Sequence, residues 1–380
     1  MICVSQAGRA RSTEAGFTLL ELIVVIAIIG LLLAVLLSAI LSSRESSRRA
    51  QCSSNLRQIG TALSSHHEQK GHLPAAVIWT PAGEPLGENI APPGTIDRVS
   101  LRFSPRMEPD RVFANWVILI LPFLEEQALY NAFDMKVPID DPRHERARAT
   151  ELPIMKCPSD GWNGADNHFQ RAGLMAADLG YARGNFALNG GSNSRCLMRL
   201  SKIWPPGTCN DGFNVDGTDL KTNTRQVWGS GIGGLNKSFR YRDFPAGLSR
   251  TVAIEEIRAG VHPLDRRGVW ALGFPGCSVT VAHGNDGNRG PNAGPDAIQG
   301  CSAVSALVGN LKGLGMPCEA SPSELASEIC QQATSRSMHP DGVNLLMADG
   351  SVHFVSDAVG ANAWHEMHKR DSQSAFELPF

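Results

Sequence analysis

The sequence has almost no excess of charge of either sign, because 35 Lys and Arg residues nearly balance 37 Asp and Glu residues at a net charge of −2. Proteins that bind nucleic acid through its phosphates usually carry a surplus of basic residues, so we expect no nucleic acid partner. The chain also lacks a Cys-x-x-Cys pair, a His-Glu-x-x-His motif and a Gly-x-Ser-x-Gly elbow. These absences remove the short-range signatures of zinc sites and serine hydrolases. Catalytic groups can lie far apart in a sequence, but nothing here demands an enzyme and we expect none.

One long apolar run near the N-terminus decides the class of the protein. Residues 17–41 contain a single charged side chain, Glu21, and no polar side chain stands between Leu22 and Leu37. As an α-helix this run would rise roughly 37 Å, which exceeds a hydrocarbon core of about 30 Å. We therefore predict a membrane-spanning helix over residues 17–41. An acid inside such a helix costs about 2.5–3.5 kcal/mol, so Glu21 is expected to have a partner and a function.

Three kinds of N-terminal segment contain an apolar run. A secretory signal peptide has a core of about 7–15 residues and then a small-residue cleavage site, whereas this run is longer and no such site follows it. A plain signal anchor fits the length but explains neither Glu21 nor the junction between Gly16 and Phe17. The stretch Gly-Phe-Thr-Leu-Leu-Glu at residues 16–21 resembles the processing motif of type IV pilins and type II secretion pseudopilins.

This resemblance implies that a prepilin peptidase cuts after Gly16 and methylates the new N-terminus, Phe17. The cationic amine of Phe17 would then lie one turn from Glu21, where a negative charge also suits the start of a helix. Within one chain, Glu21 would partly neutralise that amine. Between chains, it would pair with the amine of an incoming subunit and set the axial register of a filament. The expected partners are therefore the peptidase and methyltransferase, other pilin-like subunits and the lipid bilayer.

The cysteines favour an exterior compartment. Nine cysteines are many for a cytosolic protein, and loss of a leader ending at Gly16 would remove Cys3 and leave eight. An even number suits disulfides in an oxidising environment. The sequence does not assign the pairs, and Cys52, close to the membrane, is expected to be unpaired or packed.

The basic residues do not decide the orientation, because two arginines precede the apolar run and three follow it closely. From the pilin resemblance we expect a single-pass protein of the inner membrane. Its C-terminal domain would then be periplasmic or extracellular.

The helix is expected to continue beyond the bilayer. Residues 42–69 contain no proline and one glycine, and an apolar stripe recurs every three or four residues from Cys52 to Leu63. Gly71 and Pro74 should end the helix. The predicted organisation is a leader over residues 1–16, a transmembrane helix over 17–41, a helical stem over 42–73 and an exterior domain over 74–380.

The exterior domain alternates short apolar runs with loops rich in Gly, Pro, Asn and Asp at residues 80–110, 189–235 and 284–300. Strands are expected at residues 250–257 and 268–272. We predict an α+β fold, in which a long N-terminal helix, half transmembrane and half amphipathic, packs on an antiparallel sheet with long loops.

The clearest local structure lies near the C-terminus. Two strand-like runs, residues 343–348 and 351–355, flank Asp349 and Gly350. An Asp-Gly pair between two strands predicts a hairpin with a type I′ turn, in which both central residues have positive φ. His339 precedes this pair by nine intervening residues.

The pattern of His339, nine residues, then Asp349-Gly350 resembles the C-terminal signature of a large bacterial family of prepilin-processed proteins, whose domain is of otherwise unknown function. Four further stretches resemble the same family, so that the likeness spans nearly the whole chain: residues 48–60, 121–125, 157–160 and 265–270. Residues 243–250 are a degraded version of the family's Asp-Gly-Thr-Ser-Asn stretch. Ser38 stands where the family commonly has proline, which leaves a helix kink there without its usual cause.

His339 has two interpretations. With Asp341 or Asp349 beside it, His339 would ligate a metal or act as a base. Alternatively, it hydrogen-bonds a loop that positions the hairpin, and Asp349-Gly350 is turn chemistry alone. We favour the structural interpretation.

Two other groups of acidic and polar residues stand out in the sequence. Asp211, Asn214, Asp216 and Asp219 gather the oxygen ligands that calcium prefers, but their spacing does not match an EF-hand. Calcium is kept as a candidate only, and no other cofactor is expected. The pair at residues 255–256 is expected to place one acid on each face of a strand.

Taken together, the patterns predict a structural subunit, pilin-like or pseudopilin-like, that is processed at Gly16 and Phe17. It would stay in the inner membrane until assembly into a type II secretion or type IV pilus-like structure. The alternative is a monomeric, membrane-anchored exterior domain that binds a glycan, metal or protein ligand and uses the prepilin signal only for processing.

Overall fold

The structure is a computed structural model that describes residues 19–78, 112–170, 179–191, 195–196, 230–234, 237–281, 283, 289–298, 300–320 and 330–380. Six of the predicted site residues lie outside these ranges: Gly16, Phe17, Asp211, Asn214, Asp216 and Asp219. The chain forms two compact units, one ending at Ser47 and the other beginning at Arg48.

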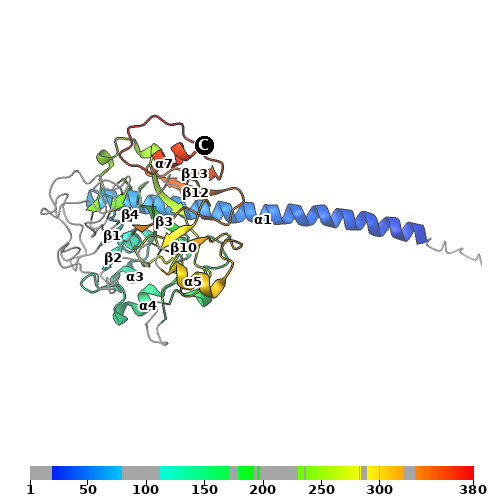
Figure 1. Cartoon of the computed structure of the whole chain (residues 1–380), viewed down its shortest axis with the longest axis horizontal. Helices are drawn as coiled ribbons and strands as arrows, with labels where there is room; N and C mark the ends of the chain where they lie inside the picture. Colours follow the sequence, from blue (N-terminus) through cyan, green and yellow to red (C-terminus); the bar gives the residue numbers. More distant parts are fainter. Residues whose placement is uncertain are drawn as a thin grey trace, which may run out of the picture. The chain divides into compact units, whose positions relative to one another are not determined.

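Helix α1, Leu19–Lys70, is continuous over 52 residues (Figure 1). In the first unit its apolar side chains are exposed, as at Leu31, which is 68% exposed. By length and composition α1 is the one helix within the described residues that can cross a membrane. Ser38 stays within the helix, because its hydroxyl donates to the carbonyl of Val35 at 2.8 Å and so satisfies its own polar group.

In the second unit, α1 buries the predicted apolar stripe. Cys52, Leu56, Ile59 and Leu63 are all at most 4% exposed. The helix ends as expected at Gly71, which has a φ of 77° and donates its N–H to the carbonyl of His67 at 2.8 Å. Glycine favours this left-handed conformation because it has no Cβ.

The main sheet has five strands in the order β13-β12-β7-β3-β8. The strands are β3 Phe186–Asn189, β7 Val252–Glu256, β8 Val279–Thr280, β12 Gly342–Met347 and β13 Val352–Ser356. Three neighbouring pairs are antiparallel and the β3–β8 pair is parallel. The α+β fold with an antiparallel sheet is therefore confirmed, with one parallel pair at its edge.

Short elements complete the described part of the domain. The helices are α2 Trp116–Ile120, α3 Gln127–Asn131, α4 Glu145–Arg148, α5 Cys301–Val308 and α7 Ala361–Met367. Two-stranded sheets join β1 Val77–Ile78 to β2 Ala114–Asn115, β4 Arg195–Cys196 to β11 Cys330–Gln331, β5 Gly233–Gly234 to β6 Lys237–Ser238, and β9 Asp296–Ile298 to β10 Cys318–Ala320. The strand expected at residues 268–272 is wrong, because this segment is a turn with a single bridge between Val269 and Arg183.

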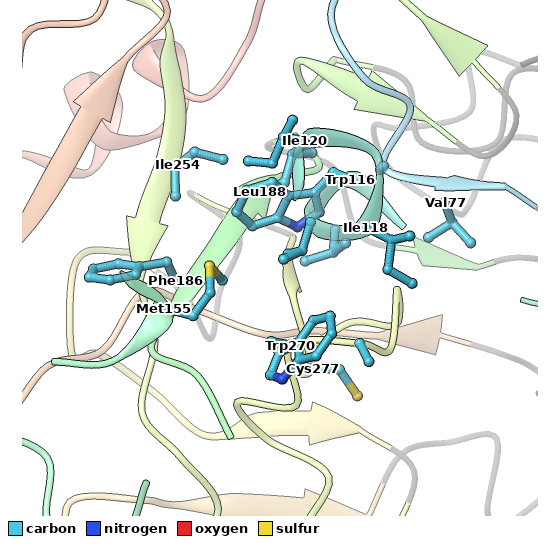
Figure 2. Close-up of a cluster of buried hydrophobic side chains, with 14 of the residues drawn as sticks. Val77, Trp116, Ile118, Ile120, Met155, Phe186, Leu188, Ile254, Trp270 and Cys277 are labelled. Atoms are coloured by element: carbon cyan, nitrogen blue, oxygen red, sulfur yellow. The ribbon is translucent and has the colours of Figure 1, made fainter. Parts of the chain in front are cut away.

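The largest hydrophobic core lies where α2 and strands β3 and β7 meet (Figure 2). Trp116 and Trp270 are fully buried in it. The indole of Trp116 donates to the carbonyl of Ser278 at 2.7 Å, and that of Trp270 donates to the carbonyl of Thr150 at 3.0 Å. Each ring is thus buried without leaving its N–H unsatisfied. A second core packs α7 against β12 and β13 (Figure 1).

The predicted hairpin is confirmed as β12–β13, but the prediction of a type I′ turn is wrong. The carbonyl of Met347 accepts the N–H of Gly350 at 3.0 Å, and the N–H of Met347 donates to the backbone carbonyl of Ser351 at 2.8 Å. Only Gly350 in this turn has a positive φ, at 91°. These features match a three-residue loop, a type I turn followed by a left-handed residue. Asp349 therefore keeps negative φ and accepts the backbone N–H of Ser351 at 2.9 Å.

Gly60 lets this hairpin approach α1 closely. A Cβ on Gly60 would lie 2.9 Å from Cδ1 of Leu346 and 3.6 Å from the Cα of Gly350. Gly60→Val is therefore expected to lower the free energy of unfolding by about 1–3 kcal/mol through overpacking. Thermal unfolding of the full chain in detergent measures this change. The exposed neighbour provides the control, since Thr61→Val should change stability by less than about 0.5 kcal/mol. Equal effects of the two variants would contradict a close contact at Gly60.

Candidate functional site

The most unusual feature of the sheet is that β7 carries two adjacent acids, Glu255 and Glu256, both at most 1% exposed. Carboxylates are rarely buried unless they are paired. Because successive side chains of a strand point to opposite faces, the two acids have different partners. We call these two groups of residues the Glu256 cluster and the Glu255 cluster.

The Glu256 cluster consists of Glu256, His339, Asn344 and the cystine formed by Cys52 and Cys157. Nε2 of His339 lies 3.2 Å from Oε1 of Glu256. Asn344 donates its side-chain amide to Oε1 at 2.9 Å and its backbone N–H to Oε2 at 2.7 Å. Both carboxylate oxygens therefore have hydrogen-bond partners from the hairpin strand and the loop before it.

The same histidine contacts the disulfide between α1 and the domain. Cys52 is bonded to Cys157, and Nε2 of His339 lies 3.4 Å from the sulfur of Cys157. Its Nδ1 lies 3.5 Å from the hydroxyl of Ser159. The expectation that Cys52 is packed is confirmed, since it is fully buried, but it is not unpaired, because its position at the start of the buried stripe brings it against Cys157.

His339 is buried, whereas Asp341 and Asp349 are exposed. The acid beside His339 is Glu256, which is 83 residues away in the sequence, rather than either aspartate of the C-terminal pattern. Asp349 accepts hydrogen bonds from Ser351 in the hairpin turn. No local spacing could indicate Glu256 as the partner. The available signal was two acids inside an otherwise apolar strand.

Residues 157–160 also support the fold through Asp160. Its Oδ2 accepts the side-chain amide of Asn185 at 2.7 Å and the backbone N–H of Ala259 at 2.7 Å. A buried carboxylate with such donors ties together three segments that are distant in the sequence. This stretch therefore has a structural role within the domain.

Residues 265–270 form part of a buried ion-pair network. The guanidinium of Arg267 lies 2.7 Å from Asp265 and 3.0 Å from Asp296. Arg336 reaches the same Asp296 carboxylate at 3.2 Å. Burial opposes the charge of Asp265, but the adjacent Arg267 outweighs it and lowers the pKa of that carboxyl below its ordinary value.

The Glu255 cluster consists of Glu255, His283, His368 and Thr280, all fully buried. Oε1 of Glu255 lies 2.9 Å from Nε2 of His283, and Oε2 lies 3.2 Å from Nε2 of His368. The hydroxyl of Thr280 donates to Oε1. Burial alone would raise the pKa of Glu255, but His283 and His368 outweigh this effect and hold that pKa well below its usual range.

The two clusters differ in what they can bind. In each, the donor atoms of three or four side chains lie within 4.8 Å of one another. The sulfurs of the Glu256 cluster are committed to the disulfide between Cys52 and Cys157. The Glu255 cluster offers two imidazole nitrogens and two carboxylate oxygens, which is a donor set for a transition metal.

Of the predicted processing and assembly residues, the structure describes Glu21, which lies in the first turn of α1. Gly16 and Phe17 fall outside the described residues, so their roles stay predictions. The same holds for the four calcium candidates.

Two family models match this chain. Residues 42–362 match a family described as "Protein of unknown function (DUF1559)". Residues 11–37 match the prokaryotic N-terminal methylation motif. No curated protein and no solved structure matches the chain.

Proposed function

The chain belongs to the DUF1559 family and carries a prokaryotic N-terminal methylation motif, and on this premise we propose that it is a pilin-like structural subunit. Prepilin peptidase would cut after Gly16 and methylate Phe17. The mature protein would be held in the inner membrane and assemble into a type II secretion or type IV pilus-like structure. The buried acids of β7, paired within the domain, are consistent with a structural rather than a catalytic role.

The observation that carries this proposal is that the two parts of α1 differ in their exposure. The methylation motif, residues 11–37, overlaps the first part of α1, and this part exposes apolar side chains. The same helix, from Cys52 on, buries one face in the domain. A prepilin-processed subunit needs both properties in one helix, because the apolar part must occupy first a bilayer and then the interior of a filament.

The disulfides support an exterior position for the domain. The Cys52–Cys157 bond is accompanied by a second, between Cys301 and Cys318. Such bonds form and persist in oxidising compartments. They favour a periplasmic or extracellular domain. The arginines that flank the apolar run do not decide this orientation.

Mass spectrometry of protein isolated from its host tests the processing. We expect the mature chain to begin at a methylated Phe17. A Gly16→Leu variant should keep residues 1–16, because it replaces the glycine after which the prepilin motif places the cut. A wild-type chain that retains Met1, or begins at another residue, would contradict the proposal.

Crosslinking tests assembly. A photo-crosslinker at Leu32 of α1 should join neighbouring subunits in membranes. Glu21→Leu should reduce this product about tenfold or more, because the N-terminal amine of an incoming subunit then has no carboxylate to pair with inside the membrane. Glu45→Gln, on the same helix beyond the apolar run, is the matched control and should crosslink normally. A wild-type protein that is processed but yields only monomer would favour the alternative, a membrane-anchored binding domain.

A further inference from the structure

The Glu255 cluster holds four donor atoms from three fully buried side chains. Glu255 comes from β7 and His283 from the segment after β8, and His368 directly follows α7. Both carboxylate oxygens of Glu255 face an imidazole Nε2, at 2.9 Å from His283 and 3.2 Å from His368. These separations are close to the edge of roughly 3.3 Å expected for a tetrahedron with metal–ligand bonds of about 2.0–2.1 Å.

The hydrogen bond from His368 to a backbone carbonyl defines the protonation of one of its ring nitrogens. Its Nδ1 lies 2.6 Å from the backbone carbonyl of Trp364. A carbonyl oxygen can only accept, so Nδ1 carries a proton. Nε2 faces Oε2 of Glu255 at 3.2 Å. It does so either as the second N–H of a charged ring, which donates to the carboxylate, or as a lone pair, in which case a cation must lie between the two acceptors.

The second histidine lies directly against the first. The rings of His283 and His368 are stacked, with centroids 3.8 Å apart and planes inclined by 20°. Stacked rings direct their nitrogen lone pairs along neighbouring planes rather than at one point, so one ring must turn for a single metal ion to bind both Nε2 atoms.

We propose that Glu255, His283 and His368 bind a divalent first-row transition metal, with Zn²⁺ as the type ion. Imidazole and carboxylate ligands suit Zn²⁺. The groups around the ligands also match those of known metal sites, because metal-bound histidines usually donate their other N–H to a carbonyl or carboxylate. Trp364 supplies that carbonyl to His368, and the hydroxyl of Thr280 orients Glu255.

The site would join the C-terminal helix to the sheet. His368 directly follows α7, whose Trp364 and Met367 pack on β12 and β13, while Glu255 lies in the centre of the sheet on β7. A metal ion there would crosslink the end of α7 to strand β7 within the domain. The Glu256 cluster does not offer the same chemistry, because its sulfurs are oxidised and Asn344 already bonds both oxygens of Glu256.

Metal titration of the full chain in detergent tests the proposal. Protein stripped with a strong chelator is titrated with Zn²⁺ alone, and separately with Co²⁺ alone. We expect about one metal ion per chain, a higher thermal midpoint with Zn²⁺, and the visible absorption of a low-coordinate site with Co²⁺. A folded wild-type chain that takes up neither ion and shows no shift would overturn the proposal.

Variants locate the site. Glu255→Gln and His368→Ala should lose the bound ion. Thr280→Val preserves the shape of the side chain and should weaken Zn²⁺ affinity by about 10–100-fold, as expected when a group that orients a ligand is removed. His339→Gln, in the Glu256 cluster, is the matched control and should keep full metal content. If Glu255→Gln fails to fold, the titrations of Thr280→Val and of the wild type still decide whether the Glu255 cluster binds the metal. Unchanged affinity in Thr280→Val, or equal loss in His339→Gln, would place any bound metal elsewhere.

Discussion

Replacing Cys52 and Cys157 together by serine is expected to lower the free energy of unfolding of the domain by about 2–5 kcal/mol. The bond joins residues separated by 105 positions, so its loss releases a long loop in the unfolded chain. It also frees α1 from its covalent tie to residues 157–160. Guanidinium unfolding of the full chain in detergent, followed by the fluorescence of the buried Trp116 and Trp270, measures the change.

The second disulfide is the matched control. Cys301 and Cys318 are separated by only 17 positions, and the chain-entropy model assigns this shorter loop about 1–2 kcal/mol less stabilisation. The double serine variant at this pair should therefore be less destabilised. Equal losses would show that loop length does not dominate. No loss on removing Cys52 and Cys157 would contradict their pairing.

Arg267→Met is expected to destabilise the domain by about 3–5 kcal/mol, because it leaves Asp265 and Asp296 buried without their shared cation. Methionine approximates the length of the stem, so the loss reports mainly the charge. Arg146→Met, at an exposed position, should change stability by less than about 0.5 kcal/mol. The same unfolding assay measures both. A small effect at Arg267 would contradict a fully desolvated network.

The same network predicts how stability depends on pH. The pKa of Asp265 in the folded protein lies below its ordinary value of 3.8. Its stabilising contribution is therefore complete above the unfolded value and is lost as the pH falls through the folded one. Between pH 5 and pH 3, roughly, the wild type should lose stability more steeply than Asp265→Asn, which has no proton to take up there. Parallel curves for the two proteins would contradict this linkage.

The parts of the fold that follow from local periodicity could be predicted from the sequence. The apolar run, the buried stripe from Cys52 to Leu63 and the end of α1 at Gly71 each depend on neighbouring residues. The hairpin followed in the same way from Asp349-Gly350 between two strands. Its turn type did not, because loop length decides it: with three loop residues, Gly350 alone needs positive φ.

The candidate site could not be predicted, because its contacts join residues that are remote in the sequence. Glu255 and His368 are 113 residues apart, and Glu256 and His339 are 83 apart. The parallel β3–β8 pair likewise depends on a long connection. What the sequence did contain was an acid pair within an apolar strand. The cost of burying unpaired carboxylates makes such a pair a reason to search for distant histidines or cations.

Cys277 has a consequence for how the domain can be studied. The structure describes it as a free cysteine with a fully buried side chain, within the core shown in Figure 2. Burial raises the pKa of its thiol to about 11. In the folded protein the thiol is therefore both inaccessible to solvent and protonated. Alkylation at neutral pH can then proceed only while the core is transiently open. The rate at which Cys277 is labelled therefore measures how often the core opens, and it does so without changing either disulfide of the described residues.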